Sequence, residues 1–205
     1  MPSATASLAT AYVSKVGSLE TTRTKVENLL ASGDLSVVDV EQVYAGLFLD
    51  AFTEFEALLE DLFLGIVSGS HASSVATTKR RVEIVPNVHT REICFEGRTY
   101  LDWLPLDKYT KKRAERFLTD GEPFSKLTAP EEKTIERLHL LRNAVAHKSD
   151  SAKSKFEASI QALPLLPQEK TPTGFLRSKP NGPAGLNQYQ IGVVELEAIA
   201  LKLCA

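Results

Sequence analysis

Apolar residues recur at helical spacing along most of the chain and predict a series of long helices. The apolar positions of the first helix are Leu8, Tyr12, Val16, Leu19, Val26, Leu29 and Leu30. Gly33 follows this run and predicts its end, because glycine readily adopts the left-handed conformation that terminates helices. Ser36 followed by Asp39 is typical of a capping box, so we expect a second, strongly apolar helix that runs to about Ser68.

The middle of the chain has a less regular pattern. Residues 69–104 contain short alternating pieces without a clear period, and we expect an irregular segment there with a short hairpin. Trp103 is expected to anchor this segment to the core. A helix resumes near Asp107 and is predicted to end at Gly121.

The clearest helix signals follow. Thr128 is a suitable N-cap, Pro130 fits the first turn, and Glu131 completes a capping box. An apolar stripe then predicts a helix that continues to about Lys148. The stripe consists of Ile135, Leu138, Leu141 and Val145.

The last part of the chain combines helices with a segment rich in proline and glycine. Residues 152–163 predict a short helix, and residues 192–204 predict a helix that closes the chain. The segment 164–187 between them is rich in proline and glycine, and we expect it to be extended on the surface. The predicted fold is all-α, a helical bundle with long antiparallel helices, an irregular insertion and a core over about residues 36–162.

Length and composition are those of an ordinary globular protein. With 205 residues, 43% hydrophobic and 24% charged, the chain has the size of a single domain over residues 1–205. Its formal net charge of -2 requires any contact with nucleic acid to come from a local basic patch. The run KYTKKRAERF over 108–117 is one, although most such runs are solvated helix faces. As residues that contact an RNA backbone we expect Lys111, Lys112, Arg113 and Lys148.

Three features favour a cytoplasmic protein. Cys94 and Cys204 are far apart and fit neither a metal site nor a disulfide framework. The first residues lack the basic start and the continuous apolar run of a secretory signal. The most apolar segment is interrupted by acidic residues between positions 50 and 61, so we expect no membrane span.

The stretch LLRNAVAHKSD, residues 140–150, places Arg142, Asn143 and His147 near the end of a predicted helix. In a chain of this composition, Arg-Asn with a histidine at this spacing is expected by chance only about 0.015 times. At about 100° per residue, Asn143 lies about 40° from His147 around the helix and can orient its imidazole. The alternative is a helix-terminal histidine that only interacts with the helix dipole.

Arg142 points about 140° away from His147, so the two cannot easily share one small site on one helix. Two copies of the helix that pack across a twofold axis could bring both pairs into one cleft, which makes a homodimer a requirement. Histidine can take a proton from a ribose 2′-hydroxyl or give one to a leaving 5′-oxygen. Arginine suits a phosphate whose oxygens gain charge in the transition state. No carboxylate cluster with magnesium-site character stands beside these residues, so we expect a transesterification of RNA without metal or cofactor.

LRNAVAHKS at the end of a helix, preceded by a long helix with DAFTEFEALLEDLF, resembles the HEPN superfamily, in particular the RiboL-PSP group and related groups of prokaryotic conflict systems. The resemblance covers about residues 40–160 and implies an α-helical dimer in which Arg142 and His147 are catalytic and Asn143 is a polar accessory. It also implies a metal-independent endoribonuclease that acts on RNA as a toxin or phage-defence effector. A cognate antitoxin or defence-system protein would be its partner.

One position departs from the family pattern. Toxins partnered by a nucleotidyltransferase antitoxin usually carry a tyrosine two residues after the histidine, where this chain has Ser149. Modification of such a tyrosine is therefore not expected. Because the superfamily includes members without nuclease activity, the second interpretation is an inactive module that binds RNA, nucleotide or a partner protein, as an antitoxin or scaffold.

Overall fold

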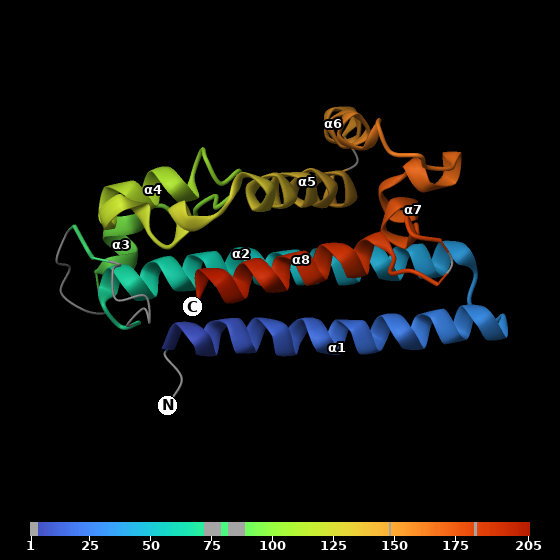
Figure 1. The fold of residues 1–205 in the computed structure, drawn as a ribbon, viewed down its shortest axis with the longest axis horizontal. Helices are drawn as coiled ribbons and strands as arrows, with labels where there is room; N and C mark the ends of the chain where they lie inside the picture. The colour runs from blue at the N-terminus through green and yellow to red at the C-terminus, as the bar shows by residue number, and fades with distance from the viewer. Residues whose placement is uncertain (1–3, 72–78, 82–88, 148, 183) are drawn as a thin grey trace. The chain divides into compact units, whose positions relative to one another are not determined.

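The computed structural model describes residues 4–71, 79–81, 89–147, 149–182 and 184–205, and every regular element among them is helical (Figure 1). The α-helices are α1 (Ala4–Ser32), α2 (Val37–Ser68), α3 (Thr90–Phe95), α4 (Thr110–Phe117), α5 (Ala129–Ala146), α6 (Asp150–Ile160), α7 (Pro172–Arg177) and α8 (Gln188–Leu203). The short 3-10 helices are η1 (Thr119–Gly121), η2 (Phe124–Lys126) and η3 (Pro167–Lys170). The prediction of an all-α fold is confirmed. Within these described ranges, no helix combines the length and the apolar character needed to cross a membrane.

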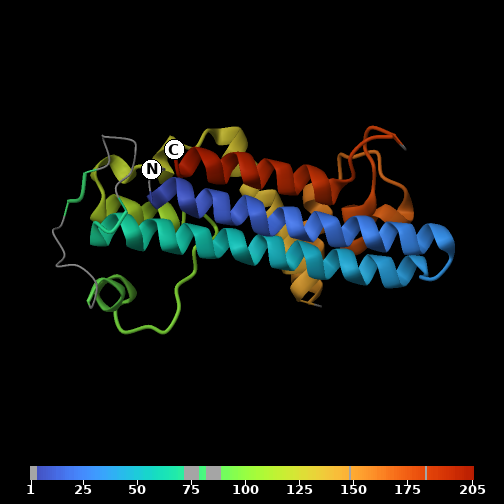
Figure 2. The same ribbon diagram turned by 90° about the horizontal axis from the view of Figure 1, so that it is seen from below.

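The chain divides into two compact units. The first consists of Met1–Val13, Glu54–Glu136 and Glu197–Ala205, and the second of Ser14–Thr53 and Arg137–Leu196. The boundaries fall inside α1, α2, α5 and α8, so each of these helices contributes residues to both units. In the second unit, α1 and α2 run antiparallel to each other and α8 lies beside them (Figures 1 and 2).

The ends of the long helices follow the predicted local signals. Gly33 closes α1 with a φ of 84°, in the left-handed region that favours glycine. The backbone N–H of Ser36 donates to Asp39 Oδ2 at 2.9 Å and that of Asp39 donates to Ser36 Oγ at 3.3 Å, which is a capping box. At α5, the backbone N–H of Thr128 donates to Glu131 Oε2 at 2.6 Å. These caps satisfy N–H groups that the helices themselves leave without partners.

The first unit has an aromatic core around Phe63. This fully buried ring lies 5.4 Å from the Trp103 ring, 5.7 Å from Phe117 and 6.4 Å from Phe124, measured between centroids. The Trp103 indole N–H donates to Glu60 Oε2 at 3.0 Å, so its polar atom is satisfied although the side chain is buried. The prediction that Trp103 anchors the segment before α4 is confirmed.

The prediction that residues 69–104 are irregular is wrong for Thr90–Phe95, which form α3. This short helix packs Cys94 and Phe95 into the core, and burial stabilises a segment too short to form a helix by propensity alone. The expected hairpin falls partly on 72–78 and 82–88, outside the described residues. Among the described ones, Arg80 forms an isolated antiparallel bridge with Leu118.

The prediction that residues 164–187 form an extended surface segment is also wrong. The segment contains η3 and α7, and Phe175 and Leu176 of α7 are buried. The Thr171 side chain caps α7 by accepting a hydrogen bond from the Gly174 N–H at 3.0 Å, and Pro172 occupies the first turn. A Cβ at Gly174 would lie 2.0 Å from the Gln168 carbonyl oxygen, so the close approach of η3 and α7 requires glycine there.

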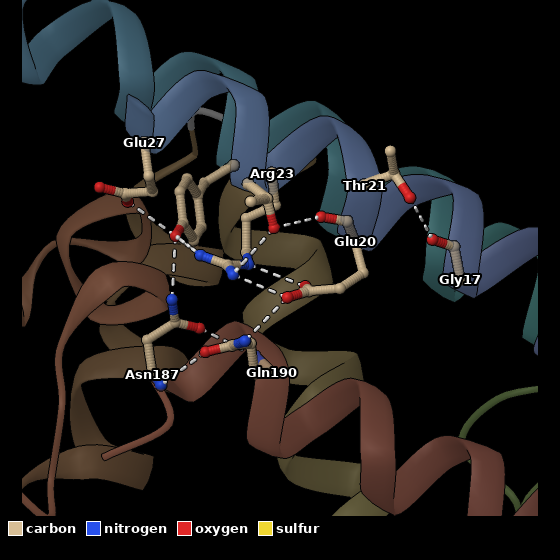
Figure 3. Close-up of polar contacts among 9 residues, drawn as sticks. Gly17, Glu20, Thr21, Arg23, Glu27, Asn187 and Gln190 are labelled. Atoms are coloured by element: carbon tan, nitrogen blue, oxygen red, sulfur yellow. Dashed lines mark hydrogen bonds and ion pairs between the residues drawn. The ribbon is translucent and has the colours of Figure 1, made fainter. Parts of the chain in front are cut away.

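A polar network joins α1 and α2 to the start of α8 inside the second unit (Figure 3). The buried Tyr44 hydroxyl donates to Glu27 Oε1 at 2.8 Å, and it accepts from Arg23 Nη1 at 3.2 Å and from Asn187 Nδ2 at 2.9 Å. Arg23 also forms two hydrogen bonds with Glu20, at 2.8 and 2.7 Å. Burial and the adjacent Glu27 raise the pKa of Tyr44 to about 12, so the hydroxyl keeps the proton that it donates.

We expect the Tyr44→Phe variant to lose about 1–3 kcal/mol of unfolding free energy. The change removes the acceptor of the buried Asn187 amide, and an unsatisfied buried donor is costly. Urea denaturation followed by circular dichroism measures the loss. Tyr100→Phe is the matched control, because Tyr100 is 73% exposed and should change stability by less than about 0.5 kcal/mol. Equal stability of the two variants would contradict a structural role for the network.

Candidate functional site

Arg142, Asn143 and His147 lie at the C-terminal end of α5 and just beyond it. Arg142 and Asn143 are half-buried on the last turns of the helix, which ends at Ala146. His147 is exposed, and its backbone N–H donates to the Asn143 carbonyl oxygen at 2.9 Å. The helix therefore ends two residues earlier than the predicted Lys148, and the imidazole of His147 follows the last turn.

The Asn143 side chain connects Arg142 with a different histidine. Its Oδ1 accepts a hydrogen bond from Arg142 Nη1 at 3.2 Å, and its Nδ2 lies 3.0 Å from His139 Nε2. Because the guanidinium can only donate, the amide oxygen faces Arg142 and the amide NH₂ faces His139. His139 Nε2 must then accept, which places the proton of the neutral imidazole on Nδ1.

The expectation that Asn143 orients the imidazole of His147 is therefore wrong, since both ends of its amide are engaged elsewhere. The physical reason is the direction of side chains on a helix, which tilt toward its N-terminus and cover the preceding turn. His139 lies one turn before Asn143 and inside α5, whereas His147 lies beyond the helix end. The His139 ring also stacks on the buried Phe52 ring, with centroids 6.3 Å apart and an angle of 8° between the planes.

This arrangement holds the Arg142 guanidinium through its hydrogen bond to Asn143, whose amide also meets His139. A side chain that is already oriented loses less rotamer freedom when it binds a ligand. His147 remains exposed to solvent at the end of the same helix. Chemically, a positioned cation can stabilise charge that develops on a phosphate, and an accessible imidazole can accept or donate a proton.

From Ser149 on, the described chain belongs to the next helix, α6. Ser149 is the N-cap of α6, and its Oγ accepts from the Ala152 N–H at 3.3 Å. The position two residues after His147, where a tyrosine would be the target of modification, is therefore a helix-capping serine in this chain. Lys148, which we predicted to contact RNA, lies outside the described residues.

The three residues of α4 that we predicted to contact RNA differ in their surroundings. Lys111 makes ion pairs with Glu132 and, at 3.1 Å, with Asp107. Burial alone would lower the pKa of Lys111, but the hydrogen bonds to Glu132 and Asp107 outweigh it and raise this pKa. The Lys111 ammonium therefore forms ion pairs within its own chain, whereas Lys112 and Arg113 line a pocket.

That pocket, which we name the α3–α4 pocket, lies in the first unit and has a volume of about 260 Å³. Its lining comprises Cys94, Glu96, Arg98, Leu101, Lys108, Tyr109, Lys112, Arg113, Arg116 and Phe117. The sequence did not predict the contribution of Arg98, because Arg98 follows α3 and joins the basic face of α4 only through tertiary packing. The helical periodicity of α4 also did not indicate that Lys111 forms ion pairs while Lys112 lines the pocket.

In comparisons with known proteins, no family model, no characterised protein and no solved structure matches the chain.

Proposed function

We propose that this protein is a metal-independent endoribonuclease of the HEPN type, with His147 and Arg142 as its catalytic residues. The observation that carries the proposal is the end of α5, where an exposed histidine follows an arginine whose guanidinium is oriented by Asn143. The all-α fold and the long apolar α2 agree with the same interpretation. Asn143 supports the reaction through Arg142 and His139, not through His147.

The proposed reaction is a transesterification inside RNA. The imidazole of His147 removes the proton from a ribose 2′-hydroxyl, and the 2′-oxygen attacks the adjacent phosphorus. The bond from phosphorus to the 5′-oxygen breaks, and that oxygen takes up a proton from solvent water, while the His147 imidazolium returns its proton to solvent. Arg142 binds the phosphate oxygens while their negative charge increases. The products are a 2′,3′-cyclic phosphate and a 5′-hydroxyl, and no metal or cofactor enters the balance.

We further propose that the active species is a homodimer. Helical spacing predicts divergent directions for Arg142 and His147, so a single chain is not expected to place both on one phosphate. If the α5 helices of two chains packed against each other across a twofold axis, Arg142 of one chain would lie beside His147 of the other. Each dimer would then contain two composite sites.

In this proposal the enzyme acts on RNA in the cytoplasm, as a toxin or phage-defence effector. A cognate antitoxin or defence-system protein would restrain it. Inhibition by modification of a tyrosine two residues after His147 is not expected, because that position is Ser149, the N-cap of α6.

Purified protein is expected to cut total cellular RNA in the presence of EDTA. The fragments should carry 2′,3′-cyclic phosphate and 5′-hydroxyl ends, because no water or metal-bound hydroxide attacks the phosphorus in the first step. Mass spectrometry of a short oligonucleotide identifies these ends. Fragments with 5′-phosphate ends, or cleavage that depends on added Mg²⁺, would contradict the proposed mechanism.

The second candidate function is a catalytically inactive module that binds RNA, nucleotide or a partner protein. The observation in its favour is the α3–α4 pocket, which collects cations in the first unit without any residue of α5. Intact RNA after incubation with the wild-type protein, together with RNA binding in a mobility-shift assay, would support this candidate.

A further inference from the structure

Positive charge dominates the lining of the α3–α4 pocket. Five cationic side chains line it, and they belong to Arg98, Lys108, Lys112, Arg113 and Arg116. Among the described residues that line it, Glu96 is the carboxylate, and Glu96 Oε1 lies 3.7 Å from Arg116 Nη1. Both partners of this ion pair are largely exposed, so the pair contributes little. The local charge of the pocket is therefore strongly positive in a chain whose net charge is -2.

Arg113 is the fixed part of this pocket. Its side chain is half-buried, and its guanidinium lies 4.5 Å from the Trp103 ring centroid. Its Nη1 donates to the Asp102 carbonyl oxygen at 3.3 Å. Burial lowers the pKa of Arg113. The neighbouring cations Arg116 and Arg98 lower it further, whereas Cys94 and the Asp102 carboxylate raise it and offset part of this repulsion.

The pocket walls limit which anion can relieve that repulsion. A volume of about 260 Å³ is small for a drug-sized ligand but sufficient for a short chain of phosphates. An extended RNA strand spreads its charges along a groove, whereas this pocket concentrates five cations around one cavity. A di- or triphosphate group carries three or four negative charges within a comparable space, and arginine forks match phosphate oxygens in geometry.

From this geometry we infer that the α3–α4 pocket is a binding site for a di- or triphosphate group, with Arg113 as its oriented anchor. The group can come from a nucleotide or from the triphosphorylated 5′ end of an RNA. Cys94 contributes only packing, because burial raises the pKa of its thiol to about 11 and keeps it protonated. The inference does not depend on the proposed nuclease activity, because no residue of α5 lines the pocket.

Trp103 provides a direct readout of binding. It is the single tryptophan of the chain, and it lies beneath the Arg113 guanidinium. Titration of the full-length protein with inorganic tripolyphosphate in EDTA should change tryptophan fluorescence in a saturable manner. Inorganic monophosphate should bind at least about tenfold more weakly, because it engages fewer of the five cations. Equal affinity for the two anions, or no saturable binding, would overturn the inference.

Two variants locate the site. Lys112→Glu and Arg113→Gln should each weaken tripolyphosphate binding at least about tenfold, since charge reversal adds repulsion and the glutamine removes the anchor. Lys155→Glu is the matched control for charge, because Lys155 is exposed on α6 and does not line the pocket. Isothermal titration calorimetry gives the affinities independently of Trp103. An equal loss of affinity in the Lys155→Glu control would show that net charge alone governs binding and would overturn the inference.

Two further titrations distinguish the sources of the phosphate group. They use ATP and a short RNA with a 5′-triphosphate, the RNA with the His147→Ala protein so that it stays intact. Tighter binding of ATP assigns the site to nucleotides, and tighter binding of the RNA assigns it to RNA 5′ ends. The same RNA with a 5′-hydroxyl must bind more weakly. If it binds equally well and is equally sensitive to Lys112→Glu, the pocket contacts RNA backbone in general, and the inference fails.

Discussion

The His147→Ala protein is expected to cut RNA at least about 100-fold more slowly than the wild type, because a positioned acid–base group contributes about 10²–10⁴-fold to a rate. The side chain is exposed beyond the end of α5, so its loss should change the unfolding free energy by less than about 0.5 kcal/mol. Single-turnover cleavage of a labelled oligonucleotide in EDTA measures the rate, and thermal denaturation measures the stability.

Two other histidines test whether the assignment to His147 is specific. His89 is exposed in the first unit, where its Nδ1 lies 3.1 Å from Glu92 Oε2, so His89→Ala is a matched control that should cut at the wild-type rate. His139→Ala should reduce the rate less than His147→Ala, because His139 acts through Asn143 on Arg142. If the His147→Ala protein cut at the wild-type rate and the His139→Ala protein did not cut, His139 and not His147 would be the catalytic histidine.

A heterodimer of Arg142→Ala and His147→Ala subunits is expected to regain about half of the wild-type rate, although each variant alone is inactive. In composite sites, one of the two retains both an intact Arg142 and an intact His147. Co-expression with two different affinity tags and sequential purification isolates this heterodimer. Its cleavage rate is then compared with that of the two parent homodimers.

The matched control pairs a His147→Ala subunit with an Arg142→Ala/His147→Ala subunit, which leaves no composite site intact. This heterodimer should be as inactive as the parents. If the first heterodimer is also inactive, each site draws both residues from one chain, and the composite-site proposal fails. An active monomer in sedimentation analysis would defeat the dimer proposal as well.

The helix ends that could be predicted from the sequence are those set by residues close together in the chain. Ser36 with Asp39 and Thr128 with Glu131 are capping pairs three residues apart, and both form in the structure. The start of α8 at Gln188 follows the same chemistry, since Asn187 Oδ1 accepts from the Gln190 N–H at 2.9 Å. The apolar pattern alone did not reveal this start. The single domain predicted from the chain length stays a prediction.

The features that could not be predicted depend on tertiary contacts or on side-chain direction. Phe175 and Leu176 become core residues because α7 packs into the second unit, although the prolines around them indicate a surface loop. Asn143 lies one turn from both His139 and His147, and helical spacing alone does not choose between them. The tilt of side chains toward the helix N-terminus makes that choice. Arg98 reaches the basic face of α4 only in the folded chain.

The central claim is that the RNA 2′-hydroxyl is the nucleophile in a cleavage driven by Arg142 and His147. Its most direct test uses an oligoribonucleotide with a mapped cut site and a single 2′-deoxyribose on the 5′ side of the scissile phosphate, in EDTA. We predict that the wild-type protein leaves this bond intact and still cuts the all-ribose oligonucleotide. Cleavage of the substituted bond at the all-ribose rate would contradict the claim, because no 2′-oxygen would then be available to attack.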